Sequence, residues 1–367
     1  MDLVGRKRGC LVVLVAPMML VLIVLLGLIA RPDLKHYVPG WKYYEHYQHF
    51  AHTPLSASAS SVEIARGDSL HTVLLKLRKA GVQSGSDLEW QLLAYQVGAA
   101  GNLKFGDYAL APAVSPHDLL QRMRHGKGEH YRFTIVEGWN IRQLRAALRQ
   151  ATPLVHRAGM LDDATLMAQL GFPGEHPEGR FLPETYLYQR GDSDLDVLRR
   201  AHAAMQKALA ETWAARDPAL KLHTPDEALI LASIVEKESG LSTERPKIAG
   251  VFLHRIARGM RLQADSTVIY GLGSIYDGNI RKRDLKTPTP YNTYVHTGLT
   301  PTPISMPGQD ALRAVTRPAV GDALYFVALG DGSGGHTFSS SLQQHNAAVA
   351  RYLQRLRERE SKTKERQ

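Results

Sequence analysis

The sequence predicts an α+β fold with three parts: an N-terminal transmembrane helix, a small α/β subdomain, and a larger, mainly helical domain with short strands. Three observations support this prediction. An uncharged apolar run occupies residues 10–30. Helical patterns dominate residues 155–258, and a short strand-like segment at 323–329 follows loops rich in Gly and Pro.

The apolar run Cys10–Ala30 is long enough to cross a bilayer, which takes about 20 helical residues. A cleaved signal peptide is the alternative, but its apolar core is only about 7–15 residues long. No A-x-A cleavage site follows the run. The basic residues 6–8 precede it, so the positive-inside rule places residues 1–9 in the cytoplasm and the rest of the chain outside.

The composition narrows the classes of partner and cofactor. The net charge of +10 suits anionic partners, but nucleic acid is not expected, because no basic–aromatic recognition motif is present. The only cysteine is Cys10, so the exported part has no disulfide. We find no H-E-x-x-H motif, Cys/His cluster or G-x-S-x-G turn, and therefore expect no metal, no cofactor and no serine nucleophile.

Residues 31–60 are expected to form a linker, because the stretch from Thr53 is small, polar and without apolar periodicity. The subdomain at 61–114 is predicted to begin with a strand and a helix capped by Ser69 or Asp68. A second helix and a strand with its turn at Gly106-Asp107 follow. This order is similar to that of a LysM-type glycan-binding module, with a generic α+β adaptor as the alternative.

The larger domain is assigned residues 115–353, followed by a charged tail at 354–367 that is either a helix end or disordered. Its first helix, at 115–127, is separated from the following strand by the principal break in the chain, before His130. An amphipathic helix is predicted at 141–148.

One helix in the larger domain contains two glutamates near its end. The sequence from Thr224 to Glu227 predicts an N-cap, a proline at the first position and a capping box, and Gly240 predicts the stop. At about 100° per residue, Glu238 falls within the apolar face of this helix. Glu236 falls on the opposite face, which is expected to be solvated.

A carboxyl group at position 238 has two reasons to keep its proton. Burial disfavours the charged form, and so does the negative end of the helix dipole. The pattern resembles lysozyme, in which an apolar pocket keeps a glutamic acid protonated for general-acid catalysis. Two alternatives remain: fraying at Ser239-Gly240 exposes Glu238 to water, or Glu238 pairs with Arg245 as a structural ion pair.

Several motifs occur in order along the exported part: VEGW, PEGRFLPETY, ASIVEKESG, MRLQADSTVIYG, PYNTYVHTGLTPTPISMPG and GGHTFSSSLQQHN. With them the chain resembles the YceG-like family of endolytic murein transglycosylases (MltG) over nearly its whole exported length. The catalytic glutamate of that family is the second of the E-K-E, which corresponds to Glu238. The chain has Met306 where the family favours Asn.

The resemblance implies a lytic transglycosylase, with a lysozyme-like catalytic domain, that cuts the β-1,4 bond between N-acetylmuramic acid and N-acetylglucosamine in nascent peptidoglycan strands. The cut leaves 1,6-anhydro ends and terminates glycan elongation. It also implies a single-pass protein of the inner membrane, with its catalytic domain in the periplasm and peptidoglycan synthases as partners. Two alternatives remain: a muramidase-type hydrolase and a non-enzymatic, membrane-tethered peptidoglycan-binding protein.

Turn-rich loops after the catalytic helix hold the candidate substrate-binding residues Gln263, Asp265, Tyr291, Asn292 and Thr293. Their amide, hydroxyl and carboxylate groups suit hydrogen bonds to sugar hydroxyls and N-acetyl groups. Turn chemistry is the alternative for Asn292 and Thr293, and helix capping is the alternative for the segment that begins with Asp265.

Glu178 and Glu184 are further candidates for substrate binding. Either of them, or Asp265, can supply the second carboxylate that a hydrolase needs about 5–10 Å from the first. Their alternative role is to hold a loop. His336, after Gly334-Gly335, is a candidate to approach a ligand or to satisfy a nearby backbone group.

Overall fold

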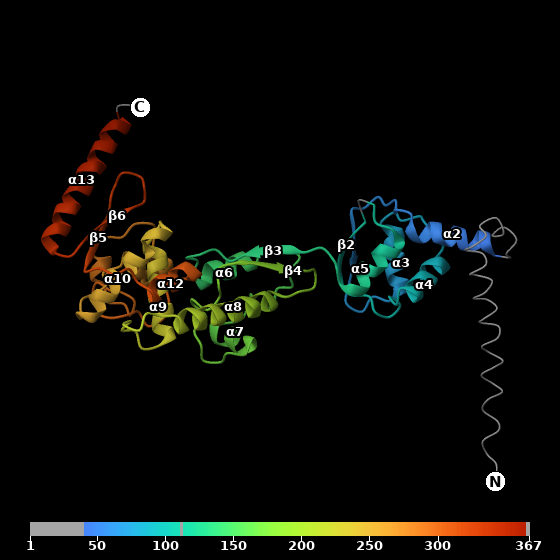
Figure 1. Cartoon of the computed structure of the whole chain (residues 1–367), viewed down its shortest axis with the longest axis horizontal. Coiled ribbons are helices and arrows are strands. Elements are labelled where there is room, and N and C mark those ends of the chain that lie inside the picture. The colour runs from blue at the N-terminus through green and yellow to red at the C-terminus, as the bar shows by residue number, and fades with distance from the viewer. Residues whose placement is uncertain (1–39, 111–112, 365–367) are drawn as a thin grey trace, which may run out of the picture. The chain divides into compact units, whose positions relative to one another are not determined.

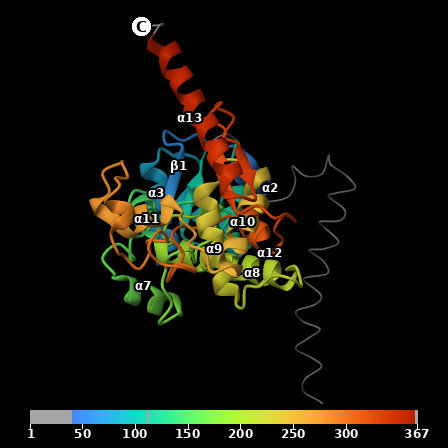
Figure 2. The same cartoon turned by 90° about the vertical axis from the view of Figure 1, so that its left-hand side faces the viewer.

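A computed structural model describes residues 40–110 and 113–364 (Figures 1 and 2). The chain divides into two compact units, Met1–Glu129 and His130–Gln367. The transmembrane helix expected at residues 10–30 lies outside the described residues. None of the helices in the described ranges combines the length and the hydropathy that a membrane span requires.

The N-terminal unit combines helices with one small sheet. Its described elements are α2 (Trp41–His52), β1 (Ser61–Ile64), α3 (Leu70–Lys79), α4 (Asp87–Gln96), β2 (Gly106–Ala109) and α5 (Pro116–His125). β1 and β2 pair antiparallel. Ser69 caps α3 by accepting a hydrogen bond from the Thr72 N–H at 3.2 Å, as predicted. The strand–helix–helix–strand order predicted from the sequence is therefore present.

Three details of this unit differ from the sequence prediction. Residues 31–60 contain α2, whose buried Phe50 packs edge-on against Trp90 at 5.5 Å, so this helix completes the core. Gly106-Asp107 is not a turn, because both residues pair with β1. The helix at 115–127, α5, packs against α2 and α4 and so belongs to this unit, which ends at Glu129, at the break predicted before His130.

Over its described residues the C-terminal unit is mainly helical, with two separate two-stranded sheets. Its elements are β3 (Tyr131–Thr134), α6 (Ile141–Leu148), α7 (Asp163–Leu170), β4 (Thr185–Tyr188), α8 (Asp194–Ala214), α9 (Pro225–Glu238), η2 (Ser242–Glu244), α10 (Arg245–Ala257), α11 (Asp265–Leu272), η3 (Gly273–Ile275), η4 (Asp284–Lys286), α12 (Gln309–Thr316), β5 (Tyr325–Ala328), β6 (His336–Ser339) and α13 (Leu342–Lys364). β3 pairs with β4 and β5 with β6, both antiparallel.

The predicted α+β class is confirmed, with one addition. The region expected to be dominated by helices contains β4, because alternate side chains of TYLY are buried against β3. The charged C-terminal segment continues α13 as far as Lys364.

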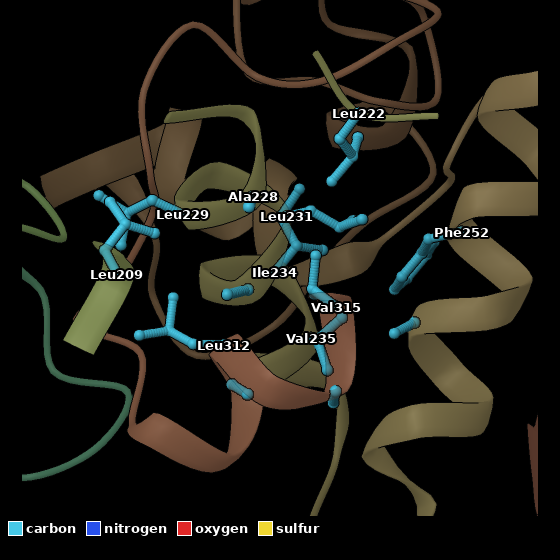
Figure 3. Packing of buried hydrophobic residues seen from close by; sticks show 14 of the residues in the cluster. Leu209, Leu222, Ala228, Leu229, Leu231, Ile234, Val235, Phe252, Leu312 and Val315 are labelled. Carbon is cyan, nitrogen blue, oxygen red and sulfur yellow. The ribbon is translucent and has the colours of Figure 1, made fainter. Parts of the chain in front are cut away.

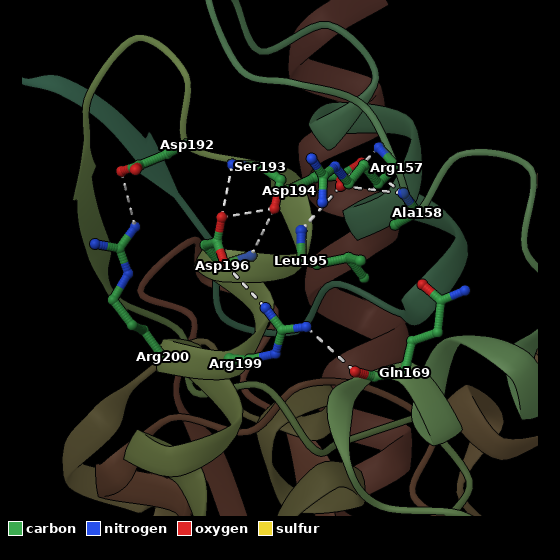
Figure 4. A network of polar contacts seen from close by, with 10 residues as sticks. All are labelled: Arg157, Ala158, Gln169, Asp192, Ser193, Asp194, Leu195, Asp196, Arg199 and Arg200. Carbon is green, nitrogen blue, oxygen red and sulfur yellow. Dashed lines mark hydrogen bonds and ion pairs between the residues drawn. The ribbon is translucent and has the colours of Figure 1, made fainter. Parts of the chain in front are cut away.

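The longest helix of the core, α8, begins at a polar network (Figure 4). Ser193 and Asp196 form a capping box, with Ser193 Oγ accepting from the Asp196 N–H at 3.3 Å. The carboxylate of Asp194 accepts hydrogen bonds from the N–H groups of Arg157, at 2.9 Å, and Ala158, at 3.0 Å. These bonds attach the 157–158 loop to the start of α8.

The core of this unit surrounds α9, which contacts α8, α10 and α12 (Figures 2 and 3). Leu231, Ile234 and Val235 of α9 pack with Leu312 and Val315 of α12, and all five are fully buried. Ser233 and Glu236 are buried as well. The face that was expected to be solvated is therefore largely buried, with Lys237 still exposed, because neighbours cover the helix on several sides.

Candidate active site

Glu238 is the last residue of α9, whose start and end are both defined by local contacts. Thr224 is the N-cap, and its hydroxyl accepts from the Glu227 N–H at 3.1 Å, as predicted. The predicted capping box is incomplete, because the Glu227 carboxylate accepts a hydrogen bond from the His223 N–H at 2.5 Å and not from the Thr224 N–H. The helix ends at Glu238, one residue earlier than a stop at Gly240 implies, because Ser239 is extended.

The Glu238 carboxyl group is half-buried, and within the described residues its hydrogen-bond partner is Ser266. Ser266, on α11, donates its hydroxyl to Glu238 Oε1 at 2.6 Å. Burial raises the pKa of Glu238, and the negative charge of Asp265 raises it further. The hydrogen bonds from Ser266 and the positive charge of protonated His336 lower this pKa, and the net direction is upward. Glu238 thus combines a tendency to keep its proton with groups that stabilise its anion.

Asp265 precedes Ser266 on α11 and is paired with Tyr294. Tyr294 donates its hydroxyl to Asp265 Oδ1 at 2.6 Å. Burial, this hydrogen bond and the charges of Asp265 and Glu238 raise the pKa of Tyr294. Asp265 makes no side-chain cap of α11, so the capping alternative for this residue is wrong.

Gln263 is exposed and occupies the left-handed region, with φ of 53°. Its Oε1 accepts a long hydrogen bond of 3.4 Å from Arg255. The exposed amide of Gln263 is therefore available two residues before Asp265.

Asn292 and Thr293 are buried and shape the segment that carries Gln263 and Asp265. Asn292 donates its amide to the carbonyl groups of Asp284, at 3.2 Å, and Thr287, at 2.7 Å. Thr293 Oγ1 accepts from the Ala264 N–H at 3.0 Å, and its carbonyl accepts from the Gln263 N–H at 3.1 Å. The contacts of both residues are those of turn chemistry, which was the alternative to direct sugar binding.

Of the other three candidates, two contact Tyr270 of α11 and one is exposed. Glu178 is fully buried and accepts from the Ile141 N–H at 3.1 Å and the Tyr270 hydroxyl at 3.0 Å. Burial raises its pKa to about 7. Tyr291 packs edge-on against Tyr270 at 4.8 Å and hydrogen bonds with Thr302. Glu184 is exposed, one residue before β4.

Comparison with known proteins assigns the family. The model of the YceG-like family matches residues 62–351. The chain belongs to the YceG-like family.

Two relatives of this YceG-like chain share the same functional name. A Bacillus subtilis protein named endolytic murein transglycosylase is 30% identical over 315 residues, covering 81% of this chain and 86% of the relative. A Streptococcus pneumoniae protein of the same name is 26% identical over 338 residues. That match covers 82% of this chain but only 60% of the relative, so the pneumococcal protein is considerably longer.

The fold of this YceG-like chain also matches a solved structure. A crystal structure of a yceG-like protein from Listeria monocytogenes has a TM-score of 0.52 and 28% sequence identity. The match covers 80% of this chain and 99% of the Listeria chain.

Glu236 of this YceG-like chain was expected in solvent, and that expectation is wrong. Its carboxylate accepts from Arg245 at 2.6 Å and from the Gly308 N–H at 2.9 Å. Glu137 also pairs with Arg245, at 3.2 Å. The ion pair with Arg245 that was considered for Glu238 is therefore made by Glu236, and among the described residues no arginine pairs with Glu238.

Proposed function

We propose that this chain is a lytic transglycosylase that cleaves the N-acetylmuramic acid–β-1,4–N-acetylglucosamine bond of peptidoglycan and forms 1,6-anhydro ends. The observation that carries the proposal is the half-buried carboxyl group of Glu238, with its raised pKa, at the end of a buried helix. The relatives named endolytic murein transglycosylases support the substrate and the reaction.

The reaction needs one carboxyl group that acts first as acid and then as base. Glu238 gives its proton to the glycosidic oxygen as the bond from that oxygen to C1 of muramic acid breaks. The C6 hydroxyl oxygen then forms a bond to C1, and its proton passes to the Glu238 carboxylate. The enzyme is restored, and no water is consumed.

The neighbours of Glu238 suit the two halves of this cycle. Burial and Asp265 favour the protonated acid before cleavage. After proton transfer, the Ser266 hydroxyl at 2.6 Å stabilises the carboxylate through Oε1 and leaves Oε2 for the proton of the C6 hydroxyl. Asp265 is anchored by Tyr294, so its charge stays in place throughout.

The test is product analysis by mass spectrometry after digestion of sacculi, with Glu238→Gln as the inactive control. Transglycosylation gives anhydro-muropeptides, which are one water lighter than the reducing ends of a hydrolase. The wild-type protein should release anhydro products, and Glu238→Gln should release none. If Glu238→Gln released as much anhydro-muropeptide as the wild type, the catalytic proposal would be wrong. The protein would then be a non-enzymatic binding protein, and the products would come from a contaminating activity.

A muramidase-type hydrolase is the second candidate, and one observation favours it. The negative charge of Asp265 acts on Glu238, so a second carboxylate is present near the first. Two-carboxylate glycosidases need a partner about 5–10 Å away. Reducing muramic acid ends as the main product would select this candidate.

We further propose that residues 10–30 anchor the enzyme in the cytoplasmic membrane, with the catalytic unit on the outer, periplasmic side. The module at 61–114 is proposed to bind glycan in the manner of LysM domains, and peptidoglycan synthases are the proposed partners. Membrane fractionation, with and without residues 1–30, tests the anchor. Recovery of the full-length chain in the soluble fraction would contradict it.

A further inference from the structure

A basic, exposed segment follows α11 in the C-terminal unit (orange in Figure 2). Residues 276–287, called the basic segment below, hold four basic side chains and two aspartates, which gives a net charge of +2. The four basic side chains are all exposed, and they are Arg281, Lys282, Arg283 and Lys286. An exposed concentration of one sign of charge attracts ligands of the opposite sign.

Two lysines carry the net charge of the basic segment. Its two arginines pair with its two aspartates, at nitrogen–oxygen distances of 2.5 and 3.5 Å. Within the described residues no carboxylate pairs with Lys282 or Lys286. Their ammonium groups are therefore open to a carboxylate from outside the chain.

Asn292 fixes the backbone on both sides of Lys286. Its amide donates to the carbonyl groups of Asp284, Leu285 and Thr287, at 3.2, 3.3 and 2.7 Å. Asn292 is buried, and hydrogen bonds in such surroundings are stronger than those exposed to water. The short helix η4, which ends at Lys286, also contacts α11. Lys286 thus has a fixed backbone and a mobile, charged side chain.

A short series of contacts links Asn292 to the Glu238 carboxyl group. Asn292 Oδ1 accepts from the Tyr294 N–H at 2.9 Å, and the Tyr294 hydroxyl donates to Asp265 at 2.6 Å. Ser266, the residue after Asp265, donates its hydroxyl to Glu238 at 2.6 Å. The basic segment is therefore attached to the same residues that surround Glu238.

The substrate of the proposed reaction carries its negative charge on its peptides. The N-acetylated sugars are uncharged, and in an intact strand the lactyl carboxyl group of muramic acid forms the amide bond to the stem peptide. The free carboxylates belong to the amino acids of that peptide. A lysine ammonium is a point charge on a flexible stem, which suits a carboxylate on a peptide that is itself flexible.

We propose that Lys282 and Lys286 bind the carboxylates of the stem peptides, so that the enzyme prefers strands whose peptides carry free carboxylates. This proposal rests on the proposed function, because it takes peptidoglycan as the substrate. Strands with amidated peptides, which lack these charges, are then the poorer substrates.

The first test measures binding by fluorescence anisotropy, with the full chain carrying Glu238→Gln so that strands are not cut. The probe is a labelled peptidoglycan strand in two forms, with its peptide carboxylates free or converted to carboxamides by a carbodiimide and ammonia. The Kd for the free form should be lower by about fivefold or more. Adding Lys282→Glu and Lys286→Glu should abolish this difference.

Lys207→Glu with Lys221→Glu is the matched control, because both lysines are exposed, lie outside the basic segment and change the net charge equally. The control should keep the preference for free carboxylates. Lys282→Arg with Lys286→Arg should keep it as well, because the charge is retained. Equal Kd values for the two forms before any lysine is changed would overturn the proposal. So would an equal loss of affinity for both forms after charge reversal, which indicates a general attraction to polyanions.

Steady-state kinetics with Glu238 intact provide the second readout. In Lys282→Glu with Lys286→Glu, KM for free-carboxylate strands should rise about fivefold or more, with the loss in KM rather than in kcat. An unchanged KM, or a loss confined to kcat, would overturn the proposal. The two proposals can fail separately: a binding preference without anhydro products contradicts the proposed reaction alone, and anhydro products without a binding preference contradict the role of the lysines alone.

Discussion

Replacing Glu178 with glutamine should make the stability of the protein less dependent on pH. Glu178 is fully buried, and its pKa is about 7 in the folded chain against 4.5 for an unperturbed glutamate. Because the folded pKa lies above the unfolded one, the stabilisation is fully present below about pH 4.5 and is lost as the pH rises through about 7. Glutamine has the same shape and stays neutral throughout.

The size of the effect follows from this difference in pKa. Between pH 5 and pH 8 the wild type should lose roughly 2–3 kcal/mol of unfolding free energy relative to Glu178→Gln. The hydrogen bonds from Ile141 and Tyr270 are retained because the glutamine oxygen accepts both.

Urea denaturation of both proteins at several pH values measures this difference. Glu184→Gln serves as the control for the substitution itself, because the Glu184 side chain is exposed. A constant difference between wild type and Glu178→Gln from pH 5 to pH 8 would refute the reasoning.

Three further predictions concern the hydrogen bond, the ion pair and the core around α9. Ser266→Ala removes a hydrogen bond to the Glu238 carboxylate, and such a bond is worth about 1.5–3 kcal/mol. We therefore expect kcat to fall about 10- to 150-fold in steady-state assays. A fall of less than twofold would contradict this expectation. Arg245→Ala leaves Glu236 buried without a cation and should cost about 3–5 kcal/mol in denaturation, whereas the exposed Arg313→Ala should cost about 1 kcal/mol or less. Ile234→Ala should destabilise by about 2–5 kcal/mol by opening a cavity, and a smaller loss in thermal unfolding would show that the site collapses.

The sequence was sufficient for the local elements, because their signals are local. The cap at Thr224, the capped start of α3 and the strand at β5 all depend on residues within one turn or one strand. The helical-wheel argument for Glu238 assumed a two-sided helix, whereas neighbours cover α9 on several sides, and the catalytic role of Glu238 stays a prediction.

Contacts between distant segments could not be predicted. Glu236 meets Gly308, 72 positions further along the chain, and His336 meets Glu244, 92 positions earlier. No pattern in the sequence links the members of these pairs. They come together in space only because α10, α12 and β6 pack into one unit. Asn292 shows the same limit, since an amide suited to sugars is equally suited to the carbonyl groups of a turn.

The burial of α9 on several sides has a consequence for slow motions. Backbone amides in such a helix exchange with solvent only in the rarest openings of a fold, whereas amides in exposed loops exchange through frequent local openings. The loop from Tyr276 to Arg283, which is largely exposed, should therefore become deuterated long before Ile234 or Val235. Under the proposed function, a long glycan strand meets loops that open often, while Glu238 lies at the end of a helix that opens rarely.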